Sequence, residues 1–205
     1  MIIDRGIVLC LLLMFPAVEA RAQAKAAPWA LFTARYDTRT SDFIYALYGY
    51  GSTFGMVGAL HNPRTDWSEV LGAVGRIFTD AAGNSHTVAT GVAQTARLWY
   101  GQVYYAPSVR VGFANVRATA ELDYPISRGG VTQFALSPIS GTIRSVGSVE
   151  LGLAMDLSAA RGDRPAVAIG PELRLPLPRA TLGVDAERMT NGTGDRVRVF
   201  FMTQL

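Results

Sequence analysis

Apolar and polar residues alternate one by one over most of this chain. From about residue 29 to the C-terminus, short segments with this two-residue period are separated by Gly-rich or charged connections. Successive side chains of a β-strand point to opposite faces, so the period predicts strands and an all-β protein. Ten segments fit the pattern: 29–36, 43–60, 67–79, 86–105, 109–124, 131–143, 146–158, 166–177, 180–189 and 196–205.

Several of these segments run for ten residues or more. Strands of soluble sheets average about five or six residues, whereas a tilted strand needs roughly 9–11 residues to cross a bilayer. We therefore predict an antiparallel, up-and-down transmembrane β-barrel of about ten strands, an even number as in bacterial outer-membrane barrels. Eight strands is the alternative, if segment 131–143, which Pro138 interrupts, and one neighbouring segment are loops.

The connections between the segments also alternate in character. Residues 105–108, 144–145 and 178–179 read as tight turns, and the longer connections 37–42, 80–84, 127–130, 160–165 and 191–195 fall between them. Outer-membrane barrels have short periplasmic turns and longer external loops. The longer connections are therefore predicted to be external, and 61–66 is the one exception to the alternation.

The polar face of the segments carries charges of both signs. In segment 146–158, Leu151 and Leu153 share one face, and Glu150 and Asp156 share the other. Lipid excludes charge from the outer face of a barrel, whereas opposite charges can pair inside it. We predict an interior charge network, either structural or lining a small polar pore, that contains Arg117, Glu121, Asp123, Glu150, Asp156, Glu172, Arg174, Asp185, Glu187, Arg196 and Arg198.

The N-terminus reads as an export signal. The densely apolar run around residues 9–15 is too short to span a bilayer as a helix, and Ala22-Gln23-Ala24 offers a small-residue cleavage site. We predict a signal peptide over residues 1–24 and one barrel domain over residues 25–205. Cys10, the only cysteine, lies within the signal, so the mature chain has no disulfide and no thiolate metal site.

The chain has a formal net charge of +3, with 19 Lys and Arg against 16 Asp and Glu. The bases are spread among the acids and form no basic patch, which argues against nucleic acid as a partner. Two distant histidines, His61 and His86, do not provide the ligands of a typical zinc site. We expect no metal and no cofactor.

The last segment resembles the C-terminal targeting strand of Gram-negative outer-membrane β-barrel proteins. Val197, Val199, Phe201 and Leu205 keep the alternate apolar spacing back from the C-terminus, with Leu205 in the place of the usual terminal aromatic residue. The resemblance implies location in the cell outer membrane. It also implies contact with outer-membrane lipid and lipopolysaccharide, and recognition of the C-terminal strand by the barrel-assembly machinery.

Three functions are consistent with the sequence. The first is a non-enzymatic membrane barrel with a structural, adhesive or minor-porin role. The second is a soluble lipocalin-like barrel that binds an apolar ligand, which requires the apolar rows to face inward. The third, favoured least, is a lipid-modifying outer-membrane enzyme. Ser85 and His86 are adjacent and would point to opposite faces of a strand, so they form no nucleophile–base pair, and we assign no catalytic residue.

Overall fold

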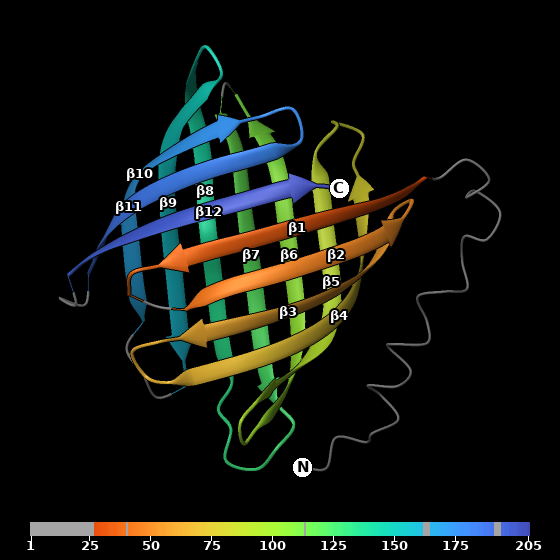
Figure 1. Cartoon of the computed structure of the whole chain (residues 1–205), viewed down its shortest axis with the longest axis vertical. Coiled ribbons are helices and arrows are strands. Elements are labelled where there is room, and N and C mark those ends of the chain that lie inside the picture. Colours follow the sequence, from red (N-terminus) through yellow and green to blue (C-terminus); the bar gives the residue numbers. More distant parts are fainter. Residues whose placement is uncertain (1–26, 40, 113, 162–164, 191–193) are drawn as a thin grey trace.

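The chain forms a closed β-barrel in the computed structural model, which describes residues 27–39, 41–112, 114–161, 165–190 and 194–205 (Figure 1). The predicted signal peptide lies outside these residues. Twelve antiparallel strands are present in the described part of the chain: β1 (Pro28–Asp37), β2 (Asp42–Tyr50), β3 (Thr53–Asn62), β4 (Trp67–Thr79), β5 (Ser85–Thr95), β6 (Trp99–Val111), β7 (Ala114–Pro125), β8 (Gln133–Val146), β9 (Val149–Ala160), β10 (Ala166–Pro176), β11 (Ala180–Met189) and β12 (Asp195–Gln204).

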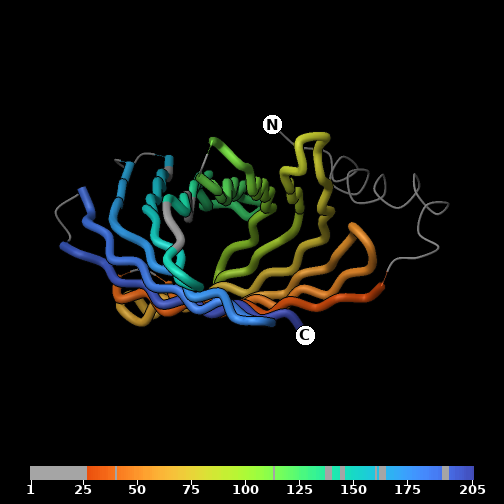
Figure 2. The backbone as a smooth tube through the Cα atoms, turned by 90° about the horizontal axis from the view of Figure 1, so that it is seen from above, coloured from red at the N-terminus to blue at the C-terminus, as the bar shows by residue number. Residues whose placement is uncertain are grey.

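Each strand pairs with its neighbours in the sequence, and β1 pairs with β12 to close the ring. In that closing seam Leu31 lies opposite Gln204, and Asp37 lies opposite Arg198. Closure leaves no strand edge unpaired, which is what a sheet requires in lipid, where water cannot satisfy the backbone. Seen from above, the ring is wider than it is tall, with β1 and β12 side by side (Figure 2).

The prediction of an antiparallel up-and-down barrel is confirmed, but the strand number is wrong. Two predicted segments each contain a hairpin, so that the barrel has twelve strands rather than ten or eight. Segment 43–60 is β2 and β3, joined by a two-residue turn at Gly51 and Ser52. Segment 86–105 covers β5 and the first half of β6. The turn predicted at 105–108 lies within β6, where Pro107 has no partner on β7 but pairs with His86 of β5.

The connections are short at both ends of the barrel. Those at the end that carries the chain termini span residues 51–52, 80–84, 112–113, 147–148 and 177–179, and those at the opposite end span 38–41, 63–66, 96–98, 126–132, 161–165 and 190–194. Gly51 and Gly147 open two-residue turns with φ of 57° and 61°, a conformation that a residue with a Cβ adopts only at a cost. Connection 80–84 therefore shares its end with the termini, contrary to prediction, and 63–66 is an ordinary member of the other set.

The outer surface of the barrel is apolar. Val57, Val70 and Leu153 are 64%, 57% and 49% exposed, although they lie within strands. Exposed aromatic side chains lie toward both ends, with Tyr36, Trp99 and Tyr124 at one end and Tyr50, Phe78 and Tyr105 at the other. An apolar belt between aromatic residues is the surface of a membrane barrel. The inverted arrangement that a soluble lipocalin-like barrel requires is not the one observed.

No described residue belongs to a helix that could cross a membrane.

Candidate functional site: the inner wall

The inner wall carries the charged residues of the barrel. All eleven residues proposed from the sequence lie on the inward-facing side of their strands, β7 and β9 to β12, and all are buried or half-buried. Further polar residues that the sequence analysis did not identify share this face on the other half of the ring, among them Arg35, Asp37, Glu69 and Gln102.

Six of these residues form a compact group on β1, β9, β11 and β12, here called the arginine–carboxylate cluster: Asp37, Asp156, Asp185, Glu187, Arg196 and Arg198. Arg198 donates to Asp185 at 2.8 Å and to Glu187 at 2.7 Å, and its third nitrogen donates to Asp156. Arg196 donates to Glu187 and Asp156 and lies 3.8 Å from Asp37. None of the six is more than 6% exposed, and each hydrogen bond that the two guanidinium groups make to a described residue goes to a carboxylate.

A second set of ion pairs lies farther along the same wall. Arg174 pairs with Glu172 at 2.6 Å and donates to the Ser140 hydroxyl at 2.8 Å. Arg117 lies 3.5 Å from Glu150. The side chains of Arg117 and Glu150 are 30% and 26% exposed, although they point inward, so the space that they face inside the barrel is accessible to solvent.

A third group surrounds the amide of Gln102 and contains no base; we call it the Gln102 cluster. The Gln102 Nε2 lies 3.3 Å from Glu69, 3.1 Å from Glu121 and 3.0 Å from Asp123, and Tyr104 donates its hydroxyl proton to Gln102 Oε1 at 2.6 Å. Among the described residues, no arginine forms an ion pair with these three carboxylates.

The polar contacts inside the barrel follow the wall and do not cross it. The longest step around the ring is from β12 to β9, three strands away, in the contacts of Arg196 and Arg198 with Asp156. Opposite positions in a ring of twelve strands are six strands apart. No hydrogen bond or ion pair between described inward side chains therefore joins the two sides of the barrel.

Aromatic side chains on the inner face also lie against the wall. Each of four inward rings covers a glycine directly opposite it on the neighbouring strand, so close that a Cβ on the glycine would collide with the ring. The pairs are Trp29–Gly49, Tyr45–Gly58, Phe54–Gly75 and Phe200–Gly183. The missing side chain of each glycine thus makes room for the ring on the neighbouring strand.

Apolar residues occupy much of the inner face of β1 to β6. Phe54, Ala73, Ala89 and Tyr104 form one buried cluster, and Leu71, Ala93 and Tyr100 form another. The inner wall is therefore divided into an apolar half on β1 to β6 and an ionic half on β7 to β12. The Gln102 cluster lies at the boundary, because Glu69 and Gln102 come from the first half, whereas Glu121 and Asp123 come from the second.

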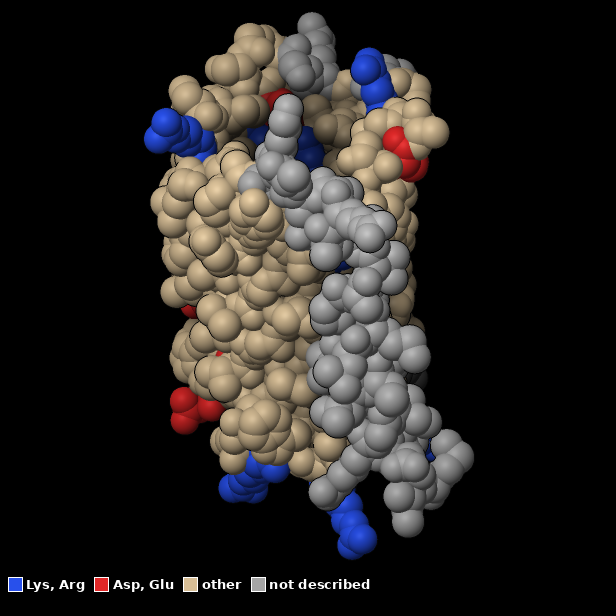
Figure 3. All heavy atoms as spheres, turned by 90° about the vertical axis from the view of Figure 1, so that its right-hand side faces the viewer, with Lys and Arg blue, Asp and Glu red and all other residues tan. Residues whose placement is uncertain are grey.

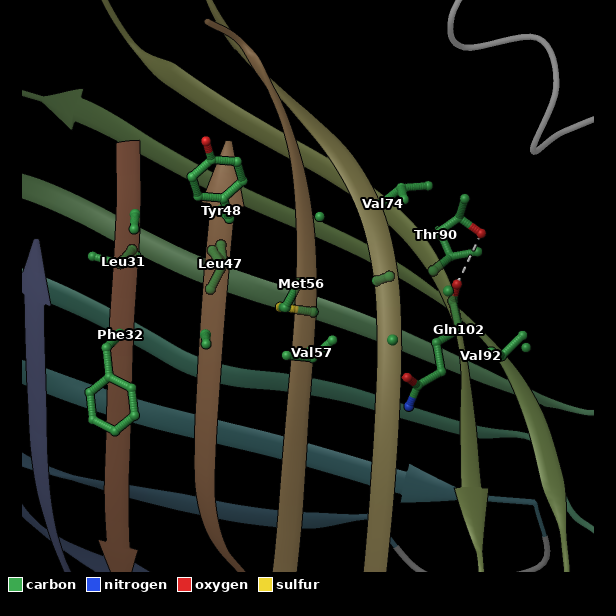
Figure 4. A pocket seen from close by; sticks show the side chains of 18 of the residues that line it. Leu31, Phe32, Leu47, Tyr48, Met56, Val57, Val74, Thr90, Val92 and Gln102 are labelled. Atoms are coloured by element: carbon green, nitrogen blue, oxygen red, sulfur yellow. Dashed lines mark hydrogen bonds between the residues drawn. The ribbon is translucent and has the colours of Figure 1, made fainter. Parts of the chain in front are cut away.

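The outer face carries a groove that is lined mainly by apolar residues. An apolar groove of about 890 Å³ runs across the first seven strands, where Phe32, Tyr48 and Val57 stand beside small residues such as Gly55 and Gly72 (Figure 4). In the side view, charged residues gather toward the two ends of the barrel, and the upper end is hollowed, with basic side chains visible inside (Figure 3). The groove therefore belongs to the apolar belt, and the charged residues belong to the interior and the ends.

His86, which the sequence analysis considered beside Ser85, contacts aromatic rings and an acid. The His86 ring lies on the outer face between the rings of Phe78 and Tyr105, 2.9 Å from the Tyr105 hydroxyl and 3.3 Å from an Asp80 oxygen. Among the described residues, no group of three or more His, Cys, Asp or Glu side chains is arranged to hold a metal ion.

Comparison with known proteins identifies the fold. No family model and no curated protein matches the sequence. Among solved structures, the KdgM porin in complex with disordered oligogalacturonate matches with a TM-score of 0.60 and 7% sequence identity, over 86% of this chain and 98% of that chain. The NanC porin matches with a TM-score of 0.58 and 11% identity, over 86% of this chain and 100% of that chain. The prediction of a small outer-membrane β-barrel is confirmed at the level of the fold.

Proposed function

We propose that this protein is a small porin, through which hydrophilic solutes cross an outer membrane by passive diffusion. The observation that carries the proposal is the course of the polar contacts, which follow the inner wall and, among the described residues, do not join its two sides. Barrels of about eight strands are filled by their own side chains, whereas those of about 16–18 leave an aqueous channel. A ring of twelve strands lies between these sizes, so the arrangement of the side chains decides whether it conducts.

Two features of the wall favour an open lumen. The inward side chains of Arg117 and Glu150 keep about a quarter to a third of their surface in contact with solvent. The inward rings, such as Tyr45 over Gly58, cover glycines of the neighbouring strand. Both features keep side-chain volume near the wall, where it does not obstruct a solute.

The connections supply no plug. The longest, residues 126–132, has seven residues, and the others are shorter. Loops of this length close a hairpin and have little chain left to fold back into a barrel. The same shortness argues against a large receptor surface, and thus against an adhesive role. The matched KdgM and NanC structures are porins, which agrees with the proposal.

The partners that we propose follow from the two surfaces. The apolar belt would contact lipid chains. The end opposite the termini carries exposed Arg64, Arg97 and Arg128, whose guanidinium groups suit the phosphates of lipopolysaccharide. On β12, Val197, Val199 and Phe201 form an exposed outward row, which suits recognition of this strand by the assembly machinery.

The test is conductance of the purified protein. The barrel, extracted in detergent and checked for heat-modifiable migration on a gel, is added to a planar bilayer, and single-channel steps are recorded. Liposomes that contain it are tested in parallel for swelling in galactose. We expect discrete steps and swelling from the folded protein, and neither from the heat-denatured protein.

A matched pair of variants attributes the current to the lumen. Thr33 points inward and Ala34, the next residue on β1, points outward. Thr33→Trp should lower the step size because the indole adds volume inside, whereas Ala34→Trp adds the same group toward lipid and should leave it unchanged. Absence of steps from correctly folded protein would refute the porin proposal and favour a purely structural barrel.

A further inference from the structure

We infer that the lumen selects against anions and admits cations and neutral solutes; this rests on the proposed porin function. The described inward side chains include more acids than bases. Among the described residues, nine inward carboxylates are buried or half-buried: Asp37, Glu69, Glu121, Asp123, Glu150, Asp156, Glu172, Asp185 and Glu187. Only five guanidinium groups share that position: Arg35, Arg117, Arg174, Arg196 and Arg198. The formal excess is four negative charges, and it is still three if the exposed Arg110 beside the turn at 112–113 is added.

Four of the five bases are already engaged by carboxylates. Arg196 and Arg198 share four carboxylates, Arg174 pairs with Glu172, and Arg117 pairs with Glu150. The fifth, Arg35, lies with its guanidinium 4.4 Å above the Phe43 ring and donates to the Ser41 carbonyl. Two of these bases keep a buried nitrogen without a hydrogen-bond partner among the described residues, Arg35 Nε and Arg117 Nη1, but the inward carboxylates outnumber the bases.

The carboxylates offer more hydrogen-bond acceptor atoms than the neighbouring donors can occupy. In the Gln102 cluster, three carboxylates lie within 3.3 Å of one amide nitrogen, which carries only two protons. Glu121 and Asp123 are half-buried and thus still reach the solvent inside the barrel. In the arginine–carboxylate cluster, the buried Oδ1 of Asp156 has no hydrogen-bond donor among the described residues. Acceptors for a cation are therefore in surplus in both clusters.

The Gln102 cluster and the arginine–carboxylate cluster both lie near one opening of the barrel. Glu69 is the third residue of β4, Asp123 is the third from the end of β7, and Arg196 is the second of β12. All three positions lie at the end opposite the chain termini. The Gln102 cluster contains no base, and an excess of one sign of charge between low-dielectric walls concentrates ions of the opposite sign. Rings of Asp and Glu are the usual basis of cation selectivity in channels.

An acidic lumen predicts solutes that differ from the oligogalacturonate in the KdgM structure. KdgM was solved with oligogalacturonate, a polyanion. A lumen with excess carboxylates repels such a solute, so the solutes of this protein should be small cations or uncharged molecules rather than acidic saccharides.

The experiment is the reversal potential of the purified wild-type protein in a planar bilayer under a KCl gradient. At low salt we expect K⁺ to be preferred over Cl⁻ by a ratio on the order of 10, the lower end of the enrichment found in charged clefts. The preference should decline as the salt rises to about 1 M, where the Debye length is about 3 Å. In liposome swelling, galactose should enter faster than galacturonate, which differs from it by one carboxylate.

Two double variants locate the selectivity. Glu121→Gln with Asp123→Asn removes two carboxylates from the Gln102 cluster and should lower the K⁺ preference several-fold. Asp66→Asn with Asp195→Asn removes the same charge from exposed positions outside the lumen and should change it little. Asn suits position 66, where φ is 52°. If the first double variant does not fold, the single substitution Glu69→Gln gives the same comparison.

The outcomes are distinct. No conductance from folded wild-type protein would refute the porin proposal and the inference with it. Conductance with Cl⁻ preferred, or with equal permeability for both ions at low salt, would overturn the inference alone. An equal loss of K⁺ preference in both double variants would also overturn it, because the selectivity would then come from the general surface charge.

Discussion

Removal of Arg198 should be among the most destabilising single changes in this barrel. Its guanidinium is 1% exposed and donates to three carboxylates, on Asp156, Asp185 and Glu187. Arg198→Leu leaves these acids close to one another, with the Arg196 guanidinium still donating to Asp156 and Glu187. Removing one partner of a buried ion pair costs about 3–5 kcal/mol, because the other charge stays buried without compensation. Three charge-assisted hydrogen bonds at about 1.5–3 kcal/mol each would sum to more. Because Arg196 remains, we expect about 4 kcal/mol.

The assay is equilibrium unfolding of the reconstituted barrel in urea, followed by tryptophan fluorescence and by heat-modifiable migration. Urea is preferred because guanidinium chloride would screen the charges under study. The matched control is Arg188→Leu, on the same hairpin, where the arginine is exposed on the outward side. A surface change of this kind costs about 0.5 kcal/mol or less.

Two further variants test the physical reason. Arg198→Lys keeps the charge but loses the planar fork, so its cost should lie between those of wild type and Arg198→Leu. Arg198→Leu combined with Asp185→Leu should cost less than the sum of the single changes, because one of the stranded acids is gone. The reasoning fails if Arg198→Leu and Arg188→Leu differ by less than about 1 kcal/mol, since measured differences of that size are common for unrelated substitutions.

Two other predictions concern the outer surface and a turn. Leu153→Arg, in the middle of the outward row of β9, should cost about 2–4 kcal/mol in urea unfolding, whereas Val149→Arg at the strand end should cost about 0–1 kcal/mol; equal costs would show that Leu153 does not face lipid. Hydrogen bonds from Asn84 hold the pKa of Asp80 at about 2, below its ordinary value. The Asp80 turn should thus be intact at neutral pH and lose these bonds as pH falls through about 2. A carboxyl ¹³C titration in micelles checks this, and Asn84→Ala should raise the pKa.

The inner wall explains which strands could be predicted from the sequence. In β7 to β12 the inner face is ionic and the outer face apolar, so the two-residue period is visible, as in Glu150, Leu151 and Asp156. In β1 to β6 both faces are largely apolar: Leu47 and Met56 point inward, whereas Val57 points outward. Without a polar face, a turn of two residues (51–52) or three residues (96–98) leaves little mark on the pattern. For that reason, segments 43–60 and 86–105 each concealed a hairpin.

The difference between the two halves of the inner wall also explains which charged residues could be predicted from the sequence. The eleven charges proposed from the sequence all come from strands in which an apolar row made their side of the strand evident. The residues that were missed, such as Arg35, Asp37 and Glu69, stand among inward residues that are themselves apolar or aromatic. The spacing of Arg35 and Asp37, two residues apart on one strand, was the available signal. The contacts of Gln102 with acids of β4 and β7 depend on strand order, which no local pattern reveals.

The geometry of arginine connects the stability of this wall with its charge. A guanidinium has five N–H donors but one positive charge, and buried donors must be satisfied. Arg196 and Arg198 therefore require several carboxylates, and four surround them. The arginine–carboxylate cluster therefore holds two more acids than bases. The Gln102 cluster, which contains no arginine, adds three more acids to the negative lumen that we propose.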